Sequence, residues 1–216
     1  MKVFVETGAK RVFAGALDWP GWARSGRTET AALETLLAYR DRYAAAVGKL
    51  AKVDRPAGGT DLEVVARLDG GAGTDFGVPS SVAGFDRAEV SESELSRLSD
   101  LLRAAWASFD SAASRAKGRP LAIGPRGGGR DLDKIRGHVV EADRAYIAAL
   151  GARAPGSRAS WAEVQEAFLA AIDAKLRGEL PDRGPRGGER WPARYAIRRS
   201  AWHALDHAWE IEDRSA

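Results

Sequence analysis

Apolar residues recur with helical spacing from about residue 91 onward. Between residues 93 and 116 the apolar positions are three or four residues apart, as in Leu95, Leu98, Leu101, Leu102, Ala105, Trp106 and Phe109. This rhythm is typical of a helix with one buried face. Comparable patterns predict three more helices, over residues 132–150, 160–177 and 192–213. We therefore expect a bundle of four helices in this half of the chain.

The first ninety residues have a different pattern. Three short segments read as strands: residues 3–5, 12–16 and 62–68. Thr28 is a suitable N-cap for a helix that continues to about Tyr43. Residues 70–82 are rich in Gly and Ser, and this composition predicts a loop.

The two patterns together predict an α+β protein with two domains. We expect a small sheet-plus-helix domain in residues 1–90 and a four-helix bundle in residues 91–216. A chain of 216 residues is long enough for two small domains. Hydrophobic residues make up 44% of it, which suffices for a packed core.

Composition narrows the range of functions. The net charge is only +3, with no dense run of Lys and Arg, so we do not expect a nucleic-acid partner. The absence of cysteine excludes disulfides, thiolate nucleophiles and Cys-based metal sites. No apolar run approaches the roughly 20 residues of a membrane span, and the early charge at Lys2 is unlike a signal peptide. We therefore expect a cytoplasmic protein, and the wealth of Arg, Ala and Gly is typical of high-GC bacteria.

The three histidines of the chain form the most informative pattern. His203 and His207 are four residues apart on a predicted helix, so both side chains lie on one face, about one turn apart. His138 lies on the predicted helix over residues 132–150, in line with small alanines that would let another helix or an ion approach closely. The spacing thus predicts a three-histidine site between two helices.

Three neutral imidazoles are suitable ligands for Zn²⁺, Ni²⁺, Co²⁺ or Fe²⁺, and of these we expect zinc or nickel. Three protein ligands leave a position for water or substrate, which is the arrangement of catalytic metal sites. Such an ion activates a water molecule or a thiol. Metal-bound histidines usually donate their second N–H to an acceptor, and Glu141, Asp206 and Glu210 are candidates for this role or for proton transfer. The alternative is one core histidine and an exposed pair with no metal.

Residues 93–213 resemble the DinB-like superfamily of metal-binding four-helix proteins. The resemblance lies in His138, early in the second helix, and in the His203-x-x-x-His207 pair on the fourth. It implies an up-down-down-up bundle and a metal held by these three histidines. Members with known activity include S-transferases and isomerases that use mycothiol or bacillithiol. A mycothiol-type thiol would suit the composition, by analogy alone.

Two Gly-rich segments precede the helices that carry the histidines. Residues 124–130 and 184–190 both contain Gly-Pro-Arg-Gly-Gly. Backbone N–H groups and arginines at a helix start can bind a carboxylate or phosphate. The candidate cofactor-binding arginines are Arg126, Arg130, Arg186 and Arg190. The alternative, which we favour, is that both segments are solvated connectors.

Two charged residues of the helical half are expected to interact with a specific partner side chain. Asp143 falls near an apolar stripe, and Arg198 is expected either to pair with Asp143 or to stack on an indole. The tryptophans of this half fit a core or a cleft wall better than a cofactor site. Near the N-terminus, Trp19 and Trp22 fit either the core of a hairpin or a lid over the metal site.

The N-terminal segment weakly resembles the HicB-like fold. The resemblance lies in a Pro20-Gly21 turn after Asp18 and in the helix opened by Thr28. It implies a small sheet followed by a helix. The alternative is an α+β appendage that packs on the bundle or mediates a homodimer.

These patterns support three hypotheses. The first is a metal-dependent enzyme, a thiol S-transferase or a hydrolase, acting on a small electrophilic substrate. The second is a non-catalytic metal- or ligand-binding module of a stress response or a sensor. The third is a structural protein without metal.

Overall fold

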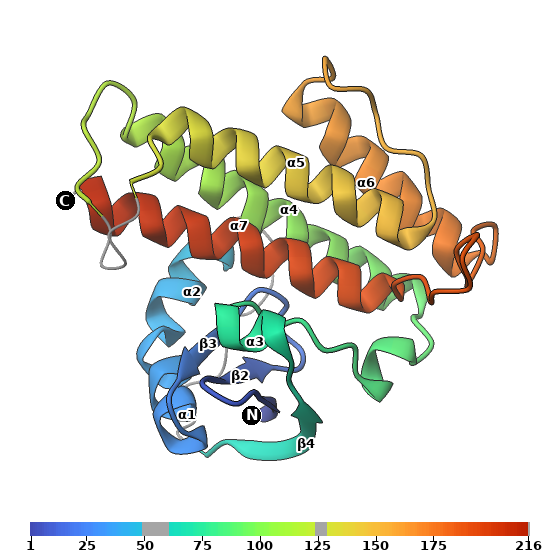
Figure 1. Cartoon of the computed structure of the whole chain (residues 1–216), viewed down its shortest axis with the longest axis horizontal. Helices are drawn as coiled ribbons and strands as arrows, with labels where there is room; N and C mark the ends of the chain where they lie inside the picture. The colour runs from blue at the N-terminus through green and yellow to red at the C-terminus, as the bar shows by residue number, and fades with distance from the viewer. Residues whose placement is uncertain (49–60, 124–128, 216) are drawn as a thin grey trace.

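In the computed structural model, the chain combines a four-stranded sheet near the N-terminus with a helical C-terminal half (Figure 1). The structure describes residues 1–48, 61–123 and 129–215. The strands are β1 (Lys2–Thr7), β2 (Val12–Ala16), β3 (Ala23–Gly26) and β4 (Glu63–Asp69). The helices are α1 (Glu29–Ala38), α2 (Arg40–Val47), α3 (Ala72–Phe76), the 3₁₀ turn η1 (Gly84–Arg87), α4 (Glu92–Arg115), α5 (Leu132–Leu150), α6 (Trp161–Leu176) and α7 (Ala193–Ser215). The predicted α+β class is confirmed.

The sheet has the strand order β3-β2-β1-β4, in which β1 and β4 are parallel and the other pairs antiparallel. Side chains alternate across β1, so Val3 and Val5 point to the opposite face from Phe4. The Phe4 face lies against α7, because the Arg198 guanidinium is 5.0 Å from the Phe4 ring centroid. On the same face the Phe13 and Trp202 rings meet edge to face with centroids 6.0 Å apart. The sheet therefore packs directly on the helix that carries two of the histidines.

The predicted helix from Thr28 to Tyr43 is in fact two helices. Thr28 caps α1 as expected, since its hydroxyl accepts a hydrogen bond from the Ala31 N–H. The helical geometry then breaks at Tyr39, where α1 ends and α2 begins. At the break the Tyr39 ring packs against Trp209 of α7, with centroids 5.1 Å apart. Tertiary packing therefore turns the chain away from the sheet and onto the long helices, which local propensity does not encode.

The Pro20-Gly21 turn is fixed against α7. Gly21 has a φ of +93°, and a Cβ there would lie 2.8 Å from Leu205 Cδ1. Trp22, which follows the turn, is almost fully buried, stacks on Tyr43, and donates its indole N–H to the Leu36 carbonyl. Trp22 is therefore part of the core rather than a lid.

Two further expectations for the N-terminal half were incomplete. Strand β3 was missed because its sequence Ala-Arg-Ser-Gly has no apolar alternation. Residues 70–82, expected to be a loop throughout, contain the short helix α3. The buried Glu6 carboxylate anchors this segment, because it accepts hydrogen bonds from the Thr74 hydroxyl and from the backbone N–H groups of Ser80 and Ser81.

The four long helices begin and end within two residues of the predicted positions. In Figure 1, α4 and α7 run in one direction and α5 and α6 run in the other. The α5–α6 connection, residues 151–160, therefore has to return along the helices (Figure 1). The two Gly-rich connections, α4–α5 and α6–α7, join antiparallel helices.

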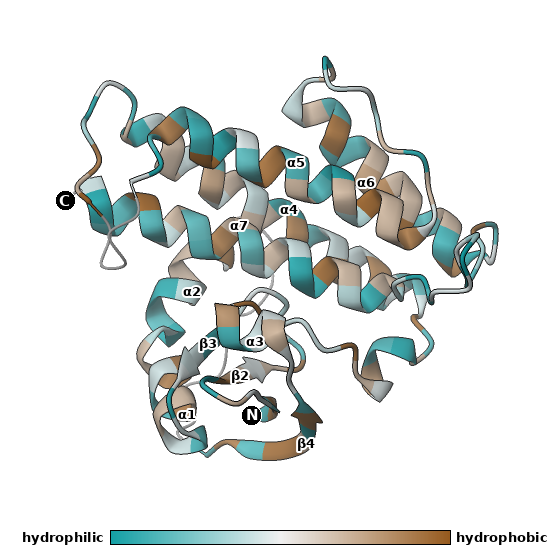
Figure 2. Ribbon diagram, viewed as in Figure 1, coloured by the Kyte–Doolittle hydropathy of each residue, from teal (hydrophilic) through white to brown (hydrophobic). Residues whose placement is uncertain are grey.

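A continuous hydrophobic core extends through the sheet, α1, α2 and the four long helices. Figure 2 shows hydrophilic and hydrophobic residues alternating along α5 and α7, as expected of helices with a buried side. Because the core spans both halves of the chain, the division at residue 90 stays a prediction. Among the described residues, no helix combines the length and hydrophobicity needed to cross a bilayer.

Candidate metal centre

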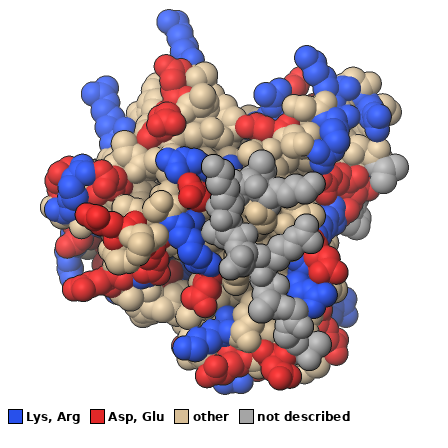
Figure 3. All heavy atoms as spheres, turned by 180° about the vertical axis from the view of Figure 1, so that it is seen from behind, with Lys and Arg blue, Asp and Glu red and all other residues tan. Residues whose placement is uncertain are grey.

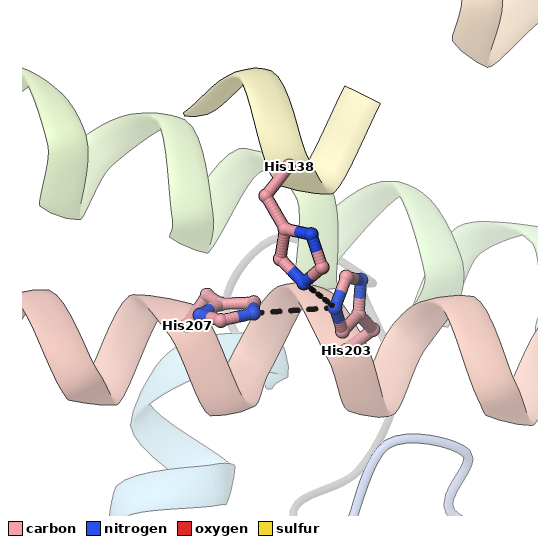
Figure 4. Close-up of side chains that lie close together, drawn as sticks. All are labelled: His138, His203 and His207. Atoms are coloured by element: carbon pink, nitrogen blue, oxygen red, sulfur yellow. Dashed lines mark hydrogen bonds between the residues drawn. The ribbon is translucent and has the colours of Figure 1, made fainter. Parts of the chain in front are cut away.

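The three histidines converge between α5 and α7, as the sequence predicted (Figure 4). His138 projects from α5, and His203 and His207 project from consecutive turns of α7. One ring nitrogen from each residue belongs to a group whose members all lie within 4.8 Å of one another. His203 and His207 are buried, whereas His138 is partly exposed. The cluster could bind a metal ion that solvent reaches past His138.

The spacing of the nitrogens fits a shared ion. The Nε2 of His203 is 3.2 Å from the Nε2 of His138 and 3.2 Å from the Nε2 of His207. Two nitrogens bound at about 2.0–2.1 Å to one tetrahedral ion would lie about 3.3 Å apart. A proton on His203 Nε2 can be donated to only one of the two neighbouring nitrogens. A cation between the rings would use all three lone pairs.

Burial disfavours the charged form of two of the three histidines. The pKa of His138 is lowered to about 4, chiefly by burial and also by the charges of His207 and Arg130. The pKa of His203 is likewise well below its usual value, because of burial first and then the charges of His207 and Arg199. Neutral imidazoles have the free lone pairs that a metal ligand needs.

Glu210 orients one ligand. Its carboxylate lies 2.7 Å from Nδ1 of His207, which assigns the proton of the neutral ring to Nδ1 and the lone pair to Nε2. Arg214 donates to the same carboxylate at 2.6 Å. The hydrogen bond from His207 and the contact with Arg214 hold the pKa of Glu210 down, at about 2. Glu210 therefore remains an anion at neutral pH.

Arg214 fixes this arrangement in place. Beyond Glu210, it donates to the backbone carbonyls of Ala122 and Arg130, on the connection that leads into α5. The side chain is almost fully buried. The sequence analysis did not single out Arg214, although its position four residues after Glu210 on one helix was a usable signal.

The other two acidic candidates have different partners. Asp206 lies between the two histidines of α7, and its carboxylate pairs with Arg24 of β3 at 2.9 Å. Glu141 is exposed, and its nearest cation is Arg144 at 3.6 Å. The structure thus brings Glu210 to the cluster, ties Asp206 to the sheet, and gives Glu141 no described contact with the histidines.

The described parts of the two Gly-rich segments lie far apart. Because α5 and α7 are antiparallel, residues 129–130, before α5, and residues 184–190, before α7, lie at opposite ends of the helical half (Figure 1). Arg130 is close enough for its charge to lower the pKa of His138, whereas Arg126 lies outside the described residues. At the other end Arg186 is exposed, and Arg190 lines an open groove and donates to the Ala148 carbonyl. The three described arginines, Arg130, Arg186 and Arg190, therefore do not form one anion site.

Asp143 and Arg198 do not pair with each other, contrary to one expectation. Asp143 is fully buried and accepts hydrogen bonds from the Trp106 indole at 3.0 Å and the Ser200 hydroxyl at 2.7 Å. Arg198 instead forms a two-pronged ion pair with the buried Asp86 of η1, at 2.7 and 2.8 Å. It contacts the rings of Phe4 and Tyr195 rather than an indole. The partner was missed because Asp86 lies in a segment with no recognisable pattern.

The fold and the site describe an α+β protein with a three-histidine cluster between two antiparallel helices. No known protein family, curated protein or solved structure matches the chain. On the face drawn in Figure 3, basic and acidic side chains of the described residues are interspersed rather than separated by sign.

Proposed function

We propose that this chain is a metal-dependent enzyme that activates a small thiol for transfer to an electrophilic substrate. The observation that carries the proposal is the convergence of three imidazole nitrogens, with the Nε2 of His203 3.2 Å from those of both His138 and His207. Zinc and nickel suit such a ligand set. A bound ion of this kind would lower the pKa of a thiol or of water in its open position.

We further propose that residues 93–213 form a DinB-like up-down-down-up bundle. The directions of α4 to α7 in Figure 1 support this assignment. So does the distribution of the histidines, one near the start of α5 and a pair spaced by four residues on α7. The mycothiol-type thiol comes from the resemblance alone.

The residues around the cluster have distinct parts in this reaction. Glu210 and Arg214 orient the His207 ring, and the low pKa of Glu210 makes it a poor proton acceptor at neutral pH. The thiol proton would therefore leave to solvent past the partly exposed His138. A sulfur lone pair forms the new S–C bond. In a displacement the bond to the leaving group breaks and its electron pair departs with that group, and in an addition the π bond of the electrophile breaks and its electron pair takes up a proton from solvent.

The test is a transfer assay with the full chain loaded with zinc or nickel. Low-molecular-weight thiols, including cysteinyl glycosides, are incubated with a panel of electrophiles, and loss of free thiol is followed. We expect turnover by the wild type and loss of at least 100-fold in His203→Ala. Equal rates for the two proteins across the panel would refute the proposal.

A non-catalytic sensor is the second candidate, and the contact between Arg24 and Asp206 favours it. Asp206 lies between two histidines of the cluster, so a shift of α7 on metal binding would be transmitted to β3. Hydrogen exchange of β3 with and without zinc tests this role. A sensor predicts a zinc-dependent change in the wild type that Asp206→Asn abolishes, and an unchanged β3 would exclude it.

A further inference from the structure

Arg199 is a buried guanidinium without an acceptor. The residue is 8% exposed and lies one turn before His203 on α7. It forms no hydrogen bond or ion pair with any described residue, and its Nη1 is fully enclosed. The same holds for one ring nitrogen each of Trp202 and His203, and for the Nε atoms of three other arginines, Arg24, Arg144 and Arg190. Each of those three arginines has another guanidinium nitrogen that hydrogen-bonds. Among the buried arginines of the described residues, only Arg199 has no hydrogen-bonded acceptor at all.

Aromatic rings hold the guanidinium by its faces. Its central carbon lies 4.7 Å from the Trp202 ring centroid and 5.2 Å from that of Tyr146 on α5. Such stacking offsets part of the cost of burying the charge. It leaves the N–H groups, which point outward in the guanidinium plane, without acceptors. Asp143 is close enough for the charge of Arg199 to lower the pKa of its carboxyl, but no hydrogen bond joins the two. A buried guanidinium without a hydrogen-bonded acceptor is costly, so its retention favours a role in binding an anion.

The position of Arg199 relates it to the histidine cluster. Four residues on a helix correspond to a rise of about 6 Å, so Arg199 and His203 occupy adjacent turns of α7. The charge of Arg199 contributes to lowering the pKa values of His203 and His138. On the facing helix α5, the small residue Ala142 lies one turn after His138 and one turn before Tyr146.

We propose that Arg199 binds the carboxylate of a small ligand whose other end occupies the open position at the histidine cluster. A planar carboxylate matches the paired donors of a guanidinium. One negative charge also balances the single buried positive charge, whereas a phosphate dianion would leave an excess charge among aromatic rings. The adjacent-turn spacing suits a spacer of two or three carbons. This inference rests on the proposed function in one respect, which is that the other end of the ligand binds a metal ion held by the three histidines.

The test compares two thiols with the same carbon chain, one ending in a carboxylate and the other in an uncharged methyl ester. 3-Mercaptopropionate and its methyl ester are titrated calorimetrically into the zinc-loaded full chain. We expect the wild type to bind the acid at least ten times more tightly than the ester. Arg199→Gln should remove this preference without weakening ester binding, and Arg199→Lys should retain part of it. Arg103→Gln, which changes an exposed arginine of α4 that pairs with Asp100, should leave the preference intact.

The outcomes separate this inference from the proposed function. If the wild type binds acid and ester equally, or Arg199→Gln is destabilised yet keeps the preference, the inference is overturned. If Arg199→Gln does not fold, the inference is tested by comparing the acid–ester preference of the wild type with that of Arg199→Lys. If neither thiol binds the zinc-loaded site but propionate binds the wild type, more weakly Arg199→Lys and not Arg199→Gln, the proposed function fails and the carboxylate site at Arg199 stands.

Discussion

The Nδ1 of His207 lies 2.7 Å from the carboxylate of Glu210, which is itself held by Arg214. Removing the charge of the Glu210 carboxylate leaves the His207 ring less firmly oriented and its Nε2 less basic. We predict that Glu210→Gln weakens zinc binding about 10- to 100-fold, as expected for loss of a partner that orients a ligand. Competition with a chromophoric chelator measures the affinity.

Glu141→Gln is the matched control for this experiment. Glu141 lies on α5, three residues after His138, but is exposed and contacts Arg144 instead of a ring. Its substitution should leave zinc affinity within about twofold of the wild type. Equal affinities of Glu210→Gln and Glu141→Gln would show that Glu210 does not support the site.

Asp143 should make stability depend on pH. Burial raises the pKa of this carboxyl to about 7, against about 3.9 in an unfolded chain. Between these values the folded state binds more protons than the unfolded state, so the contribution of Asp143 to stability falls as pH rises from about 4 to 7 and then levels off. Asp143→Asn removes this titration.

Urea unfolding of both proteins at several pH values measures the effect. The free energy of unfolding of the wild type, relative to Asp143→Asn, should decrease from pH 4 to pH 7 and stay constant above. A difference that is flat, or that rises with pH, would contradict the assignment of a neutral buried carboxyl.

The ion pair between Arg198 and Asp86 anchors η1 to α7. The Asp86 side chain is 1% exposed, so Arg198→Met would leave a carboxylate buried without its partner. We predict a loss of about 3–5 kcal/mol in unfolding free energy. Adding Asp86→Asn should recover part of the loss, because the buried charge is then gone. If the double variant is as unstable as the single one, packing rather than charge is responsible.

Two glycines should respond in opposite ways to alanine. Gly21 has a positive φ and lies against Leu205, so Gly21→Ala should cost roughly 1–3 kcal/mol of unfolding free energy. Gly137 is exposed in α5 with open space around its Cα, so Gly137→Ala should stabilise by roughly 0.5–1 kcal/mol. Thermal denaturation of the two variants tests both signs, and a stabilising Gly21→Ala would contradict the described turn.

Much of the fold could be predicted from local patterns. The apolar rhythm located α4 to α7, because each has one continuous buried side, and a Ser or Asp cap marks the start of α4, α5 and α6. Strand β3 and the break at Tyr39 were not predictable in this way. Both depend on contacts with distant segments, β3 with β2 and Tyr39 with Trp209.

In the candidate site, too, the features set by local spacing were predictable and those set by distant contacts were not. The histidines were identifiable because four-residue spacing places two rings on one helix face, and His207 with Glu210 lies within the same turn. The partners of Asp206, Asp143 and Arg198 come from other elements and carry no signal in sequence. Arg199 was overlooked because a buried arginine cannot be distinguished by spacing from one on a solvated face.

Elemental analysis of the purified full chain tests the metal centre most directly. We predict close to one zinc or nickel ion per chain in the wild type after exposure to the metal and dialysis. The variant with His138, His203 and His207 all changed to alanine should retain none while remaining folded by circular dichroism. A wild type that holds no ion, or a triple variant that holds as much as the wild type, would contradict the account.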